Sequence, residues 1–149
     1  MSNHAFAWED RYLLGHVQMD ATHREFVECV DALLCVPDAE LAVALAAFAR
    51  HAESHFGEED RWMAESDFPA RGCHADEHAK VLESVLAVQA ELAAGNVGLV
   101  RELAQALQDW FPAHADYMDS ALAQWLVRRS HAGAPLVFRR QAMTVAAMP

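Results

Sequence analysis

The stretch HAESHFGEEDRWM, residues 51–63, places two histidines and four acidic residues beside large apolar side chains. The apolar residues that precede it recur at steps of three and four, the spacing of one face of an α-helix. When this face is continued into the stretch, His55 and Glu59 fall on it, four residues apart. The sequence therefore predicts a helix whose buried face carries polar side chains. That face consists of Leu41, Leu45, Phe48, Ala52, His55, Glu59 and Trp62.

The other polar residues of this stretch are predicted to have ordinary roles. Glu53, Glu58 and Asp60 lie on other sides of the helix, where water solvates them. His51 lies one turn before His55, close to the buried face, and we expect it to be structural or exposed. Within this stretch, the candidate functional residues are therefore His55 and Glu59.

The composition indicates one folded globular domain: 149 residues, of which 54% are hydrophobic and 22% charged. The formal net charge of -11 disfavours nucleic acid and anionic membranes as partners, because both bind basic surfaces. No segment approaches the ~20 apolar residues that span a bilayer, and the N-terminus lacks the pattern of a signal peptide. Cys29, Cys35 and Cys73 lack CxxC spacing, which favours reduced thiols in a cytoplasmic protein.

Four amphipathic segments separated by short breaks predict an all-α fold, an up-down-up-down four-helix bundle. The breaks are at Pro37 and in the sequences SDFPARG and GNVG. No repeat or linker indicates a second domain, so residues 1–149 are expected to form one domain, with the bundle at about 16–128. The predicted helices cover residues 20–36, 38–65, 70–94 and 97–128, between an N-terminal arm at 1–15 and an extended C-terminal tail at 129–149.

Each predicted helix presents at least one histidine on its buried face. The stripe of the third helix, continued backwards, reaches His78 and His74. The apolar stripe of the fourth helix, continued forwards, reaches His114. In the first helix, His23 lies just before the apolar residues of the buried face. Leaving such groups buried without partners costs ~1–3 kcal/mol each, and metal coordination between the helices would offset that cost. Five imidazoles with carboxylates and no cysteine among them suit two transition-metal ions, with iron the leading candidate.

The motifs that contain these residues resemble those of the hemerythrin family, specifically the single-domain bacterial hemerythrins. They occur in the family's order and cover most of the chain. The resemblance implies a four-helix bundle and a non-heme di-iron centre that binds O2. The matching motifs are WEDRYLLG (8–15), MDATH (19–23), HFGEEDRWM (55–63), FPARGCHADEH (68–78) and HADYMD (114–119).

The resemblance also adds Asp119 to the candidate metal ligands. Asp119 lies five residues after His114, which is about 140° round an ideal helix, so the apolar stripe does not include it. The resemblance implies that Glu59 and Asp119 bridge two irons. In the family pattern, His74, His78 and His114 complete one iron, and His23 and His55 hold the other.

The ligand count that the resemblance implies leads to an expected function. An oxo or hydroxo bridge and two bridging carboxylates give each iron three ligands. Three histidines then make one iron six-coordinate, whereas two histidines leave the other five-coordinate with one open position. Such a position suits dioxygen or another small diatomic, so we expect reversible O2 binding for storage, delivery or sensing rather than enzymatic turnover. The alternatives are a di-iron enzyme or sensor acting on peroxide or nitric oxide, and an iron store. A sensor would need a separate protein partner, because the sequence shows no fused signalling domain.

Two positions depart from the family pattern. His16 stands where an aliphatic residue is usual, and we expect it to be a surface histidine. Pro112 lies two residues before His114 inside the fourth helix, where it removes a backbone hydrogen bond and is expected to kink the helix. A distortion there would change how His114 and Asp119 point. The other histidines without a family counterpart, expected to be structural or exposed, are His4, His51 and His131.

Overall fold

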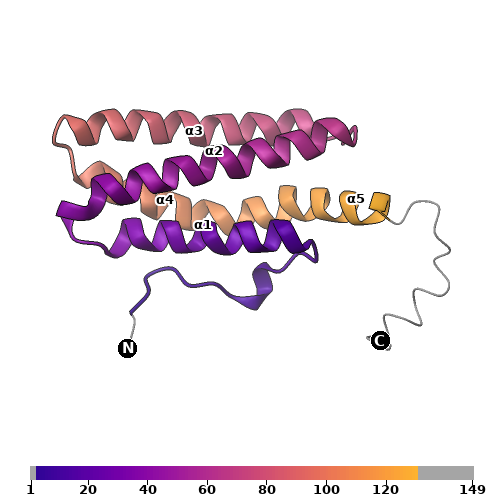
Figure 1. Cartoon of the computed structure of the whole chain (residues 1–149), viewed down its shortest axis with the longest axis horizontal. Coiled ribbons are helices and arrows are strands. Elements are labelled where there is room, and N and C mark those ends of the chain that lie inside the picture. Colours follow the sequence, from indigo (N-terminus) through magenta and orange to yellow (C-terminus); the bar gives the residue numbers. More distant parts are fainter. Residues whose placement is uncertain (1–2, 131–149) are drawn as a thin grey trace.

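The computed structural model describes residues 3–130, and these form an all-helical bundle (Figure 1). A π-helical segment, Ala115–Asp119, joins the last two helices without a turn, so that they form one long rod. The predicted four-helix bundle is confirmed, and the C-terminal tail from residue 131 onwards lies outside the described residues. The helices are α1 (Val17–Cys35), α2 (Leu41–Glu65), α3 (Arg71–Ala93), α4 (Gly98–His114) and α5 (Ser120–Ser130).

Neighbouring helices pack in a closed ring. The contacting pairs are α1 with α2, α2 with α3, α3 with α4, and α4 with α1. This arrangement turns one face of every helix towards a common interior. No helix among residues 3–130 combines the length and the apolar character that a membrane span requires.

Two apolar clusters fill the interior. The larger one contains Phe26, Phe48, Phe56 and Phe111, each no more than 1% exposed. Burial of such side chains stabilises the fold by about 1.5–3 kcal/mol each. The smaller cluster lies around α5 and the facing ends of α1 and α2, and it contains Met19, Met63, Phe68, Leu122 and Ala123.

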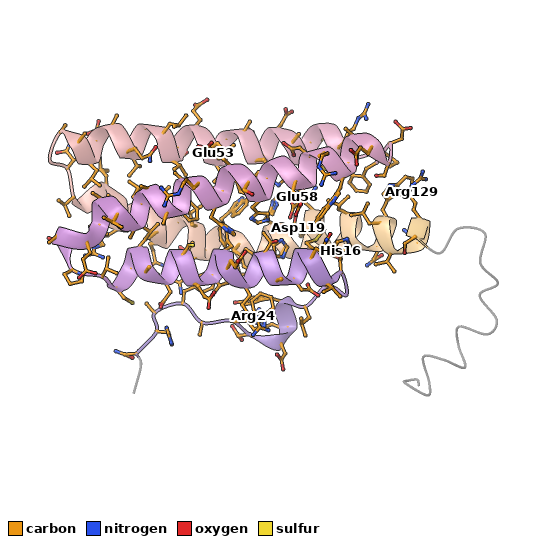
Figure 2. The ribbon with its side chains drawn as sticks, in the orientation of Figure 1. His16, Arg24, Glu53, Glu58, Asp119 and Arg129 are labelled. Carbon is orange, nitrogen blue, oxygen red and sulfur yellow. The ribbon has the colours of Figure 1, made fainter. Side chains whose placement is uncertain are left out.

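The N-terminal arm, which runs along the bundle in Figure 1, contributes to the larger cluster. Phe6 and Tyr12 are buried, and their rings lie 6.1 and 5.3 Å from that of Phe111, measured between centroids. Arg24 of α1 points towards this arm in Figure 2, and its guanidinium carbon lies 5.0 Å from the centre of the Trp8 ring. The arm therefore covers the α1–α4 side of the core.

His16 has a role that the sequence did not predict. It is the N-cap of α1, where its Nδ1 accepts a hydrogen bond of 3.1 Å from the backbone N–H of Met19. Its ring also lies 4.9 Å from that of Trp62. His16 is therefore half-buried rather than fully exposed, and it caps the helix that carries His23 (Figure 2).

The fourth helix contains an irregular segment, but this segment lies after Pro112 rather than at the proline. α4 continues through Pro112 to His114, and the π-helical segment begins at the next residue. A π turn contains one more residue than an α turn, so it changes which face the later residues occupy. This change of register turns Asp119 inwards, with its side chain 1% exposed.

Candidate metal centre

Seven polar side chains meet inside the bundle, and all seven are residues that the sequence analysis selected. Each is at most 5% exposed. Along α1, along α2 and along the continuous helix formed by α4, the π-helical segment and α5, these side chains lie between the larger and the smaller apolar cluster. α1 provides His23, α2 provides His55 and Glu59, α3 provides His74 and His78, and the continuous helix provides His114 and Asp119.

The carboxylate of Glu59 faces two separate pairs of histidines. Its Oε2 atom lies 3.2 Å from His23 Nε2 and 2.8 Å from His55 Nε2. Its other oxygen, Oε1, lies 3.4 Å from His74 Nε2 and 3.2 Å from His78 Nε2. Each oxygen of this carboxylate therefore serves a different group of imidazoles.

Asp119 divides its oxygens in the same way. Oδ2 lies 3.1 Å from His23 Nε2, on the side of His23 and His55. Oδ1 lies 2.9 Å from His74 Nε2 and 3.2 Å from His114 Nε2. Figure 2 shows Asp119 within the bundle. Two carboxylates thus stand between a group of three imidazoles and a group of two.

The donor atoms are close enough to share metal ions. Ligand atoms of Glu59, His74, His78, His114 and Asp119 lie within 4.8 Å of one another, and so do those of His23, His55 and Glu59. Several of these inward-facing atoms are buried and form no hydrogen bond, although they lie within 3.4 Å of an oppositely charged group. They are Nε2 of His74, His78 and His114, Oε1 of Glu59 and both carboxylate oxygens of Asp119. Metal coordination would satisfy all of them, so the residues present fit a metal centre.

In the metal-free protein, protons on the histidines balance the negative charge of the two carboxylates. Burial favours neutral His23, but Asp119 and Glu59 outweigh burial and raise the pKa of His23 to about 10. The same balance raises the pKa of His74 to about 9. Burial also opposes ionisation of Glu59 and Asp119, yet the surrounding histidines lower the pKa of both carboxyls. At neutral pH the two carboxylates are therefore charged and are balanced by protonated imidazoles.

Two further carboxylates contact the histidines from outside the cluster. Asp60 Oδ1 lies 2.8 Å from His78 Nδ1, and Glu77 Oε1 lies 3.2 Å from His114 Nδ1. The prediction that Asp60 needs only water was therefore wrong, and Glu77 was missed. Burial raises the pKa of Glu77, but the hydrogen bonds from His114 and Trp110 outweigh it and hold that pKa below its usual value. Single-helix periodicity gives no signal for either contact, because each joins neighbouring helices.

The remaining histidines and cysteines of the described residues lie outside this cluster. His51 is half-buried, and burial with the nearby His55 and His23 lowers its pKa to about 4. His4 is exposed and lies 2.8 Å from Asp31. Both agree with the expectation of structural or exposed histidines. The three cysteines are free thiols.

Comparison with known proteins agrees with the motifs. A family model described as "Hemerythrin HHE cation binding domain" matches residues 14–126. The chain belongs to the hemerythrin family, and the predicted resemblance is confirmed.

Named relatives cover most of the chain. A bacteriohemerythrin of Ralstonia nicotianae is 38% identical over 122 residues, which are 82% of this chain and 89% of that protein. A myohemerythrin of Riftia pachyptila is 23% identical over 97 residues, 65% of this chain and 79% of that protein. Crystal structures of mutant hemerythrins superpose with a TM-score of 0.76 at 19% identity, covering 83% of this chain and 98% of theirs. They show that the fold is shared.

Proposed function

We propose that this protein binds two iron ions at the buried cluster and uses one of them to bind O2 reversibly. The observation that carries the proposal is the division of the carboxylate oxygens. One oxygen each of Glu59 and Asp119 faces the group of three histidines, and the other faces the group of two. Membership of the hemerythrin family and similarity to proteins named bacteriohemerythrin and myohemerythrin support it.

The residues have separate roles in this proposal. Glu59 and Asp119 would each contribute one oxygen to either ion, and an oxo or hydroxo group would complete the pair. Nitrogen and carboxylate ligands suit iron better than calcium or magnesium, which prefer oxygen alone. When bound, the irons supply two electrons and an open position for the diatomic ligand. His74, His78 and His114 would hold one iron, and His23 and His55 would hold the other, which would keep the open position.

Aromatic rings surround the side with two histidines. The Phe111 ring lies 5.4 Å from that of His23, and the Phe26 ring lies 6.0 Å from that of His55. Phe26 and Phe111 also stack on each other at 5.1 Å. These rings exclude water and carry no group that transfers a proton, which favours reversible binding over turnover. We also place the protein in the cytoplasm, a proposal that the three free thiols support.

Metal analysis and absorption spectroscopy test this function. The reduced, iron-loaded protein is exposed to O2, returned to argon, and cycled again. We expect two irons per chain and a charge-transfer band that appears with O2 and disappears under argon in each cycle. The variant His55→Ala should lose the band, whereas the exposed control His4→Ala should keep it. Irreversible oxidation in the first cycle, or steady turnover of peroxide or nitric oxide with a reductant, would overturn the proposal.

A further inference from the structure

The two groups of histidines differ in what holds their outer nitrogens. In the group of three, Nδ1 of His78 lies 2.8 Å from a carboxylate oxygen of Asp60, and Nδ1 of His114 lies 3.2 Å from one of Glu77. Glu77 also accepts a hydrogen bond of 2.9 Å from Trp110 Nε1, which fixes the carboxylate in place. Two of the three imidazoles on this side therefore have a charged acceptor behind them.

Aromatic stacking holds the same two imidazoles. The Phe56 ring stacks on that of His78, with centroids 4.2 Å apart and an interplanar angle of 6°. The Trp110 ring stacks on that of His114, also at 4.2 Å, with an angle of 24°. Each imidazole is thus fixed both in its plane and at its outer nitrogen, with Nε2 directed towards the carboxylates of the cluster.

The group of two histidines lacks this support. Nδ1 of His23 and Nδ1 of His55 are both buried without a hydrogen-bond partner, as is Nδ1 of His74 in the other group. The rings around these two imidazoles are those of Phe111 beside His23, and of Phe56, His51 and Phe26 beside His55. The phenylalanine rings offer no acceptor, and His51 forms no hydrogen bond with His55. The side with two histidines therefore has fewer imidazoles, and no carboxylate contacts the outer nitrogen, Nδ1, of either one.

A carboxylate behind a ligating histidine has a known physical effect. It accepts the Nδ1 proton, which fixes the tautomer that leaves Nε2 free to bind metal. It also makes the imidazole more electron-rich, so that Nε2 donates more strongly to the metal. Removal of such an outer partner typically lowers metal affinity by about 10–100-fold.

We propose that Asp60 and Glu77 are positioning residues that make the His74, His78 and His114 side the tighter of the two metal sites. The first metal ion binds on that side, and the side formed by His23 and His55 binds second and releases its ion first. This inference rests on the proposed function, because it assumes that the cluster holds two ions.

Stepwise titration of the metal-free full-length protein with Co2+ under anaerobic conditions tests the proposal. Co2+ gives visible absorption bands that report its coordination, and competition with a chromophoric chelator gives the two dissociation constants. For the unmodified protein, we expect the first ion to bind at least about tenfold more tightly than the second. We expect Asp60→Asn and Glu77→Gln each to weaken the first step by about 10–100-fold and to leave the second nearly unchanged.

The substitutions keep the fold while they remove the charge. Asn and Gln are close in shape to the original residues and still offer an oxygen acceptor to the Nδ1–H donor. Helical circular dichroism of each variant checks its folding. Trp110→Phe keeps a ring over His114 but removes the N–H that holds Glu77, so it should weaken the same step by a smaller factor. Glu77→Asp, which keeps the charge, should restore part of the affinity that Glu77→Gln loses.

Matched controls come from exposed carboxylates on the same helices. Glu53→Gln on α2 and Asp76→Asn on α3 remove the same charge from residues that are exposed to solvent. Both should leave the two dissociation constants unchanged. If the controls weaken the first step as much as Asp60→Asn and Glu77→Gln do, general electrostatics explains the effect and the proposal is wrong.

The remaining outcomes separate this inference from the proposed function. Two ions that bind with equal affinity, or a loss confined to the second step in Asp60→Asn and Glu77→Gln, would overturn the inference and leave a two-metal centre intact. A protein that binds no Co2+ at the cluster would overturn both.

Discussion

His114 and Asp119 are five residues apart, yet His114 Nε2 lies 3.2 Å from Asp119 Oδ1. In an ideal α-helix a five-residue step turns through about 140°, which would direct the two side chains away from each other. The π-helical segment Ala115–Asp119 contains the additional residue and returns Asp119 to the inner face. The cluster therefore depends on a local change of helix type.

Deletion of Tyr117 should be tolerated because of this segment. Tyr117 is 82% exposed, so its removal costs little packing. The shortened segment has the length of an α turn, and the aspartate then follows His114 by four residues, as Glu59 follows His55. We expect thermal unfolding to remain cooperative and metal binding, measured by Co2+ titration, to remain detectable.

Deletion of Ala121 is the matched comparison, because this residue is also exposed but lies within α5. It rotates the rest of α5 by about 100° and turns Leu122 and Ala123, both 0% exposed, out of the core. Loss of buried Leu packing alone costs about 2–5 kcal/mol. If the Tyr117 deletion lowered the unfolding temperature as much as the Ala121 deletion, the π segment would not be the place where an additional residue is accommodated.

The same segment marks a limit of sequence periodicity. A fixed angle per residue placed His55, Glu59 and His114 on buried faces, because the helix is regular up to each of them. Asp119 came only from the resemblance, since periodicity cannot anticipate a π turn. Asp60 and Glu77 escaped prediction for another reason: their partners lie on neighbouring helices, and only tertiary packing brings them together.

The end of α2 shows how periodicity drifts. The sequence placed Trp62 on the buried face, but Trp62 is half-buried and Met63 is only 1% exposed. A stripe that repeats every seven residues drifts by ~20° per heptad on a straight helix. Trp62 lies three heptads after Leu41, so by then the drift amounts to ~60° and Met63 lies closer to the original direction.

Glu59→Gln should destabilise the metal-free protein strongly. Glu59 is 1% exposed, and its two oxygens lie within 3.4 Å of four histidine nitrogens. Loss of one charge from a buried network leaves the opposite charges without compensation, which typically costs about 3–5 kcal/mol. Urea unfolding at neutral pH measures this loss, and metal analysis should show fewer than two ions retained.

Glu58→Gln removes the same charge from the preceding residue. Glu58 pairs with Arg61 at 3.6 Å on the partly exposed surface, where such a pair contributes about 0–1 kcal/mol. Its free energy of unfolding and its metal content should therefore stay close to those of the unmodified protein. Equal effects of the two substitutions would contradict a central role for Glu59.

The stability of the metal-free protein should fall as the pH rises above neutral. The pKa of His23 is raised from the ordinary 6.5 to about 10, and that of His74 to about 9. A raised pKa means that the folded state holds the proton more tightly than the unfolded state. The resulting stabilisation is fully present below pH 6.5 and is lost progressively as the pH rises towards 9 and 10.

Metal binding should remove this dependence. A metal ion displaces the protons from the imidazoles, so the folded metal-bound protein has no such protons to lose at high pH. The difference in unfolding temperature between zinc-loaded and metal-free protein should therefore increase with pH above 6.5. A difference that stays constant or decreases would show that His23 and His74 are not protonated in the metal-free cluster.

His51→Leu should stabilise the protein and leave its metal content unchanged. The His51 ring packs 6.2 Å from that of Phe26 and 5.3 Å from that of His55, and its Nε2 atom is buried without a hydrogen-bond partner. An unsatisfied buried polar group costs about 1–3 kcal/mol, which an apolar side chain of similar size avoids. Urea unfolding of the metal-free variant should show this gain, and metal analysis should still find two ions. His51 does not contact Glu59 or Asp119, so we expect it to have no part in the metal centre. Loss of an ion, or of reversible O2 binding, in this variant would contradict that expectation.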